Sequence, residues 1–259
     1  MTSPLLALCA ALALGMAVPA ASAPAAPAHK PPAAAGGMVR DVSPESAQAL
    51  KRMSAYLAAL GPFQVTSNAN LDLVLDDGEK IQTGGVTTYK VKGPDAFVIS
   101  TAWDRQSRDF IYDGKHLTVY APKLGFYATA AAPPTIRQTL QAVDERFGIQ
   151  LPLADLFRWA EPGGEQLNKL TSGFLVGQAT VDGVETDQYA FRQESADWQI
   201  WIQRGDQPLP RKVVIVDRKD PAHPQFVATL DWDLHPTFTA DTFAFKPPAD
   251  AHAIRLAGQ

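Results

Sequence analysis

The chain has little cysteine, no excess of positive charge and no apolar run long enough to span a bilayer. Its 259 residues include one cysteine, Cys9, and 23 Lys plus Arg stand against 27 Asp plus Glu, for a net charge of −4. A single cysteine excludes internal disulfides. Without clustered Lys and Arg to neutralise phosphates, a nucleic-acid partner is not expected. The fold must therefore depend on its own hydrophobic core.

Motifs of common enzymes are also missing. The five histidines form no His-Glu-x-x-His motif, and no Gly-x-Ser-x-Gly elbow, phosphate-binding loop or Cys-x-x-Cys pair occurs. The carboxylate pairs Asp76/Asp77 and Asp104/Asp109 fall in expected hairpin tips, where water keeps a carboxyl pKa ordinary. We therefore expect no catalytic residue, no cofactor and no enzymatic activity.

One group of residues has the chemistry of metal ligands. Asp231, Asp233 and His235 share one face of an expected strand. At roughly 3.3 Å per residue the outer two would lie about 13 Å apart, too far to share one ion. We interpret them as a solvated outer face and expect no metal site.

The N-terminus has the features of an export signal. An apolar run from Leu5 to Val18 is followed by Ala21-Ser22-Ala23, the small-residue pattern of a signal-peptidase site. The run is too short to span a bilayer, so residues 1–23 are expected to form a signal peptide. Leu8 precedes Cys9 where a lipoprotein acylation site needs a small residue. We expect a periplasmic protein without a transmembrane or lipid anchor after processing.

The mature chain is expected to contain one domain. Residues 24–40 are rich in Ala, Pro and Gly and are expected to form a disordered leader. Residues 41–259 form the expected domain. It begins with a helix, because Ser43-Pro44-Glu45 supplies an N-cap, a first-turn proline and a first-turn acid, and Gly61-Pro62 ends the apolar helical spacing.

Strands dominate the remainder. Phe63, Val65, Leu71 and Leu73 share one parity, in a run interrupted only by small residues, which predicts a strand with one apolar face. Similar patterns predict about eleven strands in one curved antiparallel sheet, with a bulge at Gly84-Gly85. The strands expected after the first one are 80–92, 97–103, a pair ending at 112 and 120, 126–130, 174–180, 186–193, 198–203, 211–217 and 225–234.

A helical stretch interrupts the strands between Pro134 and Trp159. Apolar residues at helical spacing, closed by Gly148, predict one helix, and a shorter helix begins at Pro152. Both are interpreted as a lid over the curved sheet, with these candidate lid residues: Leu140, Val143, Phe147, Leu153, Leu156, Phe157 and Trp159.

Aromatic residues mark the strands. In a flat sandwich they would simply fill a core, whereas a strongly curved sheet encloses more volume than a short helical pair fills, and the surplus would hold a ligand. Trp201 has the opposite parity to Trp198 and Ile200, so either a neighbouring element covers it or it is an exposed patch for a partner. The candidate apolar lining is Phe97, Ile99, Trp103, Phe110, Tyr112, Tyr189, Phe191, Trp198 and Ile200.

Two blocks of sequence carry a family resemblance. They are Tyr112 to Leu124 with Tyr127-Ala128-Thr129, Pro133-Pro134-Thr135 and 151–156, and Trp198 to Ile202 with 208–212. These blocks resemble a bacterial family of predicted periplasmic proteins, domain of unknown function 2092. That family looks like relatives of the LolA and LolB lipoprotein carriers. The resemblance implies a mainly β (α+β) fold: a single incomplete antiparallel β-barrel of about eleven strands with a helical lid on its concave face.

Three functions are open to such a chain. The first is a periplasmic binding or carrier protein for an apolar ligand, such as an acyl chain, a lipid or a lipidated peptide. The second is a regulatory or interaction module that binds another envelope protein through a sheet edge or the lid. The third, an enzyme, has the least support because no nucleophile, paired base or ligand set is present.

Overall fold

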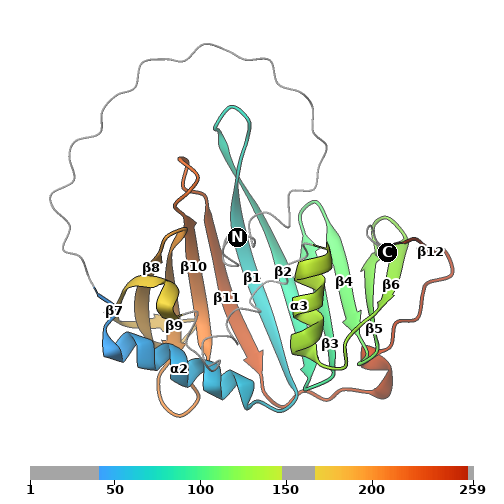
Figure 1. Cartoon of the computed structure of the whole chain (residues 1–259), viewed down its shortest axis with the longest axis horizontal. Coiled ribbons are helices and arrows are strands. Elements are labelled where there is room, and N and C mark those ends of the chain that lie inside the picture. The colour runs from blue at the N-terminus through green and yellow to red at the C-terminus, as the bar shows by residue number, and fades with distance from the viewer. Residues whose placement is uncertain (1–40, 148–166, 256–259) are drawn as a thin grey trace.

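The computed structural model describes residues 41–147 and 167–255, and within them a single twelve-stranded sheet forms the molecule. The sheet order is β12-β6-β5-β4-β3-β2-β1-β11-β10-β9-β8-β7. All neighbouring strands are antiparallel except β12 and β6, which run parallel. The sheet curves into an open half-barrel, and helices α2 and α3 lie on its inner face (Figure 1). The predicted incomplete antiparallel barrel is therefore confirmed.

The elements follow the predicted order closely. They are α2 (Pro44–Ala58), β1 (Phe63–Val74), β2 (Lys80–Lys92), β3 (Ala96–Trp103), β4 (Ser107–Tyr112), β5 (His116–Ala121), β6 (Phe126–Ala131), α3 (Ile136–Phe147), η2 (Leu167–Lys169), β7 (Leu170–Val181), β8 (Val184–Gln193), β9 (Ala196–Gln203), β10 (Pro210–Asp217), β11 (Gln225–Asp233), η3 (Ala240–Phe243) and β12 (His252–Ala253). The unpredicted twelfth strand has two residues, too few for a periodic pattern.

Helix α2 begins where the sequence predicts. The Ser43 side chain accepts a hydrogen bond from the backbone N–H of Ser46, at 3.1 Å, and satisfies a donor that the first turn leaves free. The helix buries Leu50, Met53 and Leu57 against the sheet. Its entry is fixed by a backbone bond from Ser43 N–H to the Gly173 carbonyl oxygen of β7, at 2.8 Å. This end of the inner face is therefore covered by a helix anchored to the edge strand.

The expected bulge at Gly84-Gly85 is wrong. The register between β1 and β2 is unbroken there, with Asn70 opposite Gly84 and Ala69 opposite Gly85. Gly85 serves another purpose, because a Cβ at this position would stand 2.5 Å from Cγ of Trp103 on β3. The glycine thus allows an indole ring to lie against the sheet backbone.

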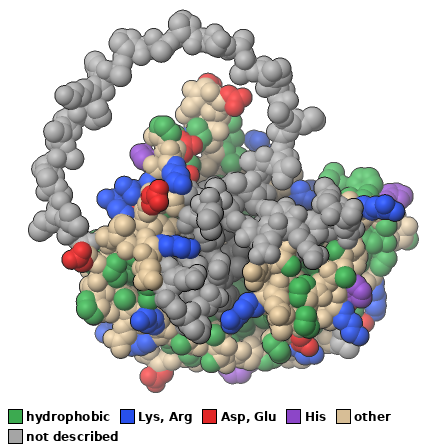
Figure 2. Space-filling view, in the orientation of Figure 1, with side chains coloured by type: hydrophobic (Ala, Val, Ile, Leu, Met, Phe, Trp, Pro, Cys, Tyr) green, Lys and Arg blue, Asp and Glu red, His purple; other side chains and the backbone are tan. Residues whose placement is uncertain are grey.

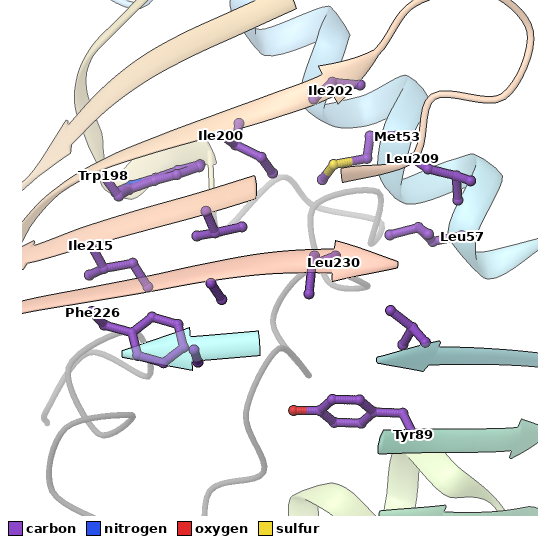
Figure 3. Packing of buried hydrophobic residues seen from close by; sticks show 14 of the residues in the cluster. Met53, Leu57, Tyr89, Trp198, Ile200, Ile202, Leu209, Ile215, Phe226 and Leu230 are labelled. Carbon is purple, nitrogen blue, oxygen red and sulfur yellow. The ribbon is translucent and has the colours of Figure 1, made fainter. Parts of the chain in front are cut away.

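Most of the core lies on the inner face. One cluster of buried side chains takes members from α2 and from strands β1 to β5 and β7 to β11. Figure 3 shows part of this packing, with Met53 and Leu57 of α2 beside Ile202 and Leu209. Burial of this continuous apolar face is the main stabilising term available to a fold without disulfides.

Several predictions about the ends of the chain lie outside the described residues. These are the signal peptide at 1–23 and the leader at 24–40. Within the described ranges, no helix is long and apolar enough to cross a membrane.

Candidate functional site

All nine candidate lining residues lie on the inner face and belong to the core cluster. None is more than 7% exposed. They come from β3 and β4 on one side and from β8 and β9 on the other: Phe97, Ile99, Trp103, Phe110, Tyr112, Tyr189, Phe191, Trp198 and Ile200. The sequence pattern therefore assigned these side chains to the correct face, while their contact with a ligand stays a prediction.

The residues of β8 and β9 pack at the end of the sheet that α2 covers. Phe191 and Trp198 stack with ring centroids 4.4 Å apart. Gly173 of β7 lies so close to them that a Cβ there would meet the Phe191 ring at 2.8 Å and the Ser46 hydroxyl at 3.0 Å. This end of the inner face is filled by the protein's own side chains.

The residues of β3 and β4 pack under the start of α3. Phe97 and Tyr112 contact each other with ring centroids 5.3 Å apart. The Tyr112 hydroxyl donates to the Pro133 carbonyl oxygen at 2.5 Å, and the Thr139 hydroxyl donates to the same oxygen at 3.1 Å. The hydroxyl of Tyr112 is thereby satisfied, and the beginning of α3 is fastened to the sheet.

Only part of the expected lid can be located. Leu140 is half-buried on α3 and packs against the core cluster. Val143 and Phe147 lie in α3, but their side chains fall outside the described residues, as do Leu153, Leu156, Phe157 and Trp159.

Between the two helix-covered ends, the middle strands carry small side chains on the inner face. Ala228 of β11 pairs with Ala69 of β1, and Ala69 pairs with Gly85 of β2. This small-residue row is bordered by Val213 of β10 and by Trp103 of β3. With strands about 4.8 Å apart, the row forms an apolar strip about 10 Å wide, whose Gly85 end lies under the Trp103 indole.

Hydroxyl side chains lie beside the small-residue row. Ser67 of β1 pairs with Thr87 of β2 and with Leu230 of β11, and both hydroxyl residues are buried. Tyr89 follows on the same face of β2 and is 6% exposed. Its ring extends over the inner face, with the hydroxyl pointing away from its own Cα along the sheet (Figure 3). The hydroxyls of Ser67, Thr87 and Tyr89 therefore belong to adjacent positions on the inner face, where Thr101 of β3, opposite Thr87, has the same parity.

The Tyr89 hydroxyl has no hydrogen-bond partner. The Thr87 side chain lies near enough to lower the pKa of Tyr89, but the two groups do not meet hydrogen-bond geometry. Burial has the larger effect and raises the pKa of Tyr89 far above its ordinary value. The phenol is therefore a neutral hydrogen-bond donor at every physiological pH.

Sequence reasoning missed the small-residue row and the hydroxyl group. Ser67 and Ala69 stand out in the sequence only as small interruptions of an apolar alternation. Because they hold the inward parity of a strand, their small size was the local signal for this row. The alignment of Ala69 with Ala228 depends on pairing between β1 and β11, at opposite ends of the chain, which one sequence does not show.

Trp201 lies on the outer face, as its parity predicts. It is 9% exposed and forms a separate small cluster with Val181 of β7 and Val214 of β10. The Lys212 ammonium group stands over its ring at 4.9 Å from the centroid. Neighbouring strands therefore cover this side chain, and the alternative of an exposed patch at Trp201 is wrong.

The carboxylates considered for chemistry have structural surroundings. Asp104 accepts hydrogen bonds from the Gly84 N–H at 2.8 Å and from the Thr83 hydroxyl at 3.1 Å. These bonds, the backbone one first, hold the pKa of Asp104 below its usual value, so the expectation of an ordinary pKa was wrong at this residue. Asp231 and Asp233 are exposed on β11, and the described part of the chain contains no group of three or more His, Cys, Asp or Glu residues placed to hold a metal.

Exposed large apolar side chains gather at both edges of the sheet. Leu175 and Val176 of β7 are 36% and 49% exposed. At the opposite edge Leu124, Phe126 and Ile254 are 67%, 41% and 52% exposed, and Figure 2 shows a hydrophobic area over β6 and β12.

Comparison with solved structures returns proteins of low sequence identity. An uncharacterised conserved protein from Thermus thermophilus is 12% identical, with 82% of this chain and 99% of that chain covered and a TM-score of 0.47. The Mycobacterium tuberculosis lipoprotein LppX is 11% identical, with 75% and 98% covered and a TM-score of 0.44. A LolA superfamily protein from Nitrosomonas europaea is 11% identical, with 77% and 97% covered and a TM-score of 0.37.

Comparison at the level of sequence gives one assignment. Among curated proteins no sequence matches significantly. The model of the family described as predicted periplasmic protein (DUF2092) matches residues 46–257, which include every described strand. The chain therefore belongs to the DUF2092 family of predicted periplasmic proteins.

Proposed function

We propose that this protein binds an apolar ligand, such as an acyl chain, a lipid or a lipidated peptide, on the inner face of its sheet and acts as a periplasmic carrier. The observation that carries the proposal is the small-residue row of Ala228, Ala69 and Gly85 between two ends that α2 and α3 cover. Alkyl chains are flexible and narrow, so an apolar strip between larger side chains suits them. Apolar area removed from water supplies about 25 cal/mol per Å² toward binding.

The assignment of individual residues follows from the packing. Trp103 and Phe226 are large, lie on the inner face near the row, and would form its walls. Phe191 and Trp198 stack on each other, Tyr112 bonds the Pro133 carbonyl oxygen ahead of α3, and these three would support the site from its ends. The lid predicted over 134–159 remains part of the proposal, with α3 as its described portion. No step in this function requires a nucleophile, a base or a cofactor.

Filling the row tests the proposal. Ala69→Leu should reduce the affinity of an apolar fluorescent dye at least about tenfold, because the added side chain would occupy the ligand's place. Ala102→Leu is the matched control, since Ala102 is exposed on the outer face of β3. The melting temperature of the unliganded variant gives a second readout. If the space above Ala69 were already filled by the protein's own side chains, the added methylenes of Ala69→Leu would lower the free energy of unfolding by about 1–3 kcal/mol. Unchanged dye affinity in folded Ala69→Leu would contradict the proposal.

A second function, docking of an envelope protein at a sheet edge, is favoured by β7. This edge strand exposes Leu175 and Val176 beyond Gly173, the residue bridged by Val42. An exposed apolar edge is a template for strand addition. Val176→Lys should abolish co-purification of a specific envelope protein while leaving dye binding unchanged. Retention of that protein by the variant would argue against docking at β7.

A further inference from the structure

Tyr89 carries a buried polar group without a partner. Its side chain is more than nine-tenths buried and its hydroxyl accepts or donates no hydrogen bond. Buried hydroxyls in native cores nearly always find a partner, because an unpaired one loses its bonds to water without replacement. Tyr112, on the same face, follows that rule through the Pro133 carbonyl oxygen. Tyr89 is thus an exception that calls for a partner from outside the chain.

The surroundings of Tyr89 define what that partner can be. Thr87 precedes it by two residues on the same face, and Ser67 lies opposite Thr87. Both are buried beside the small-residue row, so the three hydroxyls border the strip proposed for the acyl chain. A ligand lying on the row would bring its own polar atoms within reach of this group.

The charge of the surrounding side chains limits which polar group of a ligand can bind beside Tyr89. Among the described residues, the buried polar side chains are all Ser, Thr or Gln, and none is Lys, Arg, Asp or Glu. The cation in that cross-strand row is Arg108 of β4, which is only half-buried and two strands from Thr87, so about 10 Å would separate it from an anion at Thr87, and burying a charge without a close partner is costly. A neutral carbonyl oxygen needs only a hydrogen-bond donor. The phenol O–H is such a donor and stays protonated because burial raises its pKa.

We infer that Tyr89, together with Thr87 and Ser67, recognises an uncharged carbonyl group of the ligand, as found in an acyl ester or amide. This inference rests on the proposed function, because it assigns the polar part of the ligand whose hydrocarbon part lies on the small-residue row. It makes the preferred ligand an esterified or amide-linked acyl chain, and not a free alkane or an ionised fatty acid. The site would thereby recognise the ester or amide group of the ligand as well as its hydrocarbon chain.

Three probes of equal chain length test it: methyl hexadecanoate, hexadecane and hexadecanoate, each displacing an apolar dye from the purified mature protein. The wild type should bind the ester more tightly than the alkane or the anion. Tyr89→Phe should lower the affinity for the ester by about threefold to tenfold, the range expected for one hydrogen bond. The affinity for hexadecane should not change. Tyr120→Phe removes a hydroxyl from a ring that contacts Phe245 outside the core cluster and should change neither affinity. Both variants remove one oxygen atom, so folding is verified by thermal melting.

The outcomes separate the two levels of the proposal. If the wild type binds hexadecane and the ester but Tyr89→Phe keeps the same ratio between them, recognition by the hydroxyl is overturned and the carrier function stands. Preference for hexadecanoate over the ester would also overturn it, since the inference requires an uncharged carbonyl. If none of the three probes displaces the dye, the proposed function fails, and the inference fails with it.

Discussion

The indole ring of Trp103 lies directly against the backbone of Gly85. A Cβ at Gly85 would stand 2.5 Å from Cγ of Trp103 and 2.7 Å from the Ala102 carbonyl oxygen. Neither distance is possible for real atoms, so the side chain and the glycine require each other. Through this contact Trp103, a residue of β3, extends toward the middle of the sheet and borders the small-residue row.

Gly85→Ala should therefore destabilise the protein by about 1–3 kcal/mol, because the added methyl group displaces the indole or bends the strand. Urea unfolding measures the change. Gly84→Ala is the matched control: its Cβ would meet mainly the flexible Asn70 side chain, at 2.9 Å from Oδ1. Equal stability of the two variants would show that Trp103 does not need the space at Gly85.

The two faces of the sheet can be separated by tryptophan substitution. Trp103→Ala should weaken apolar dye binding by more than about 1 kcal/mol, because it removes a wall of the proposed site. Trp201→Ala should leave dye affinity nearly unchanged, because Trp201 packs with Val181 and Val214 on the outer face.

Both tryptophan variants are expected to lose stability, by as much as about 3–5 kcal/mol for a fully buried side chain. Calorimetric titration must therefore be made on samples shown to be folded at the working temperature. Loss of binding in folded Trp201→Ala, with normal binding in folded Trp103→Ala, would show that the ligand binds the outer face, which contradicts the proposal.

The architecture was predictable because strands with one buried face have a strict period of two. Val65 and Leu71 are buried while Asn68 and Asn70 between them are exposed, just as the alternation indicates. Helix α2 was predictable for a different reason, since its N-cap serine and proline are local signals. Both kinds of signal act over a few residues and need no knowledge of the tertiary fold.

The candidate site was only partly predictable. The inward direction of Phe97 and Trp198 follows from parity, but parity does not show which inward residues meet the protein's own helices. The pairing of Ala69 with Ala228 and the approach of Trp103 to Gly85 depend on register between strands. Register is set by the whole sheet, so the small-residue row appeared only with the structure.

Processing of the N-terminus is a separate prediction from the sequence. The apolar run ending before Ala21-Ser22-Ala23 should be removed, and N-terminal sequencing of exported protein should begin at Pro24. Mass spectrometry should find no acylation at Cys9, because Leu8 does not fit a lipoprotein acylation site. An acylated Cys9 or a retained apolar run would contradict the expected unanchored mature chain.

Asp104 gives a prediction about pH. The Gly84 N–H and the Thr83 hydroxyl both bond the ionised carboxylate and hold its pKa below the ordinary 3.8. A carboxyl group whose pKa is lower in the folded than in the unfolded state stabilises the fold above the unfolded pKa. That contribution is lost as the pH falls through the folded pKa. Wild type should therefore be more stable than Asp104→Asn at pH 7, and the difference should shrink progressively below about pH 4.

Urea midpoints of the two proteins between pH 7 and pH 3 measure this difference. Asp76→Asn, in the β1–β2 hairpin, makes the same change in charge without the two hydrogen bonds and corrects for the general effect of net charge. After this correction, the difference in urea midpoint between wild type and Asp104→Asn could stay constant over the whole pH range. That result would mean that ionisation of Asp104 does not connect β2 to the end of β3. A difference in urea midpoint that disappears on acidification would show that the charge of the carboxylate, and not only the shape of the side chain, holds the two strands together where Trp103 meets Gly85.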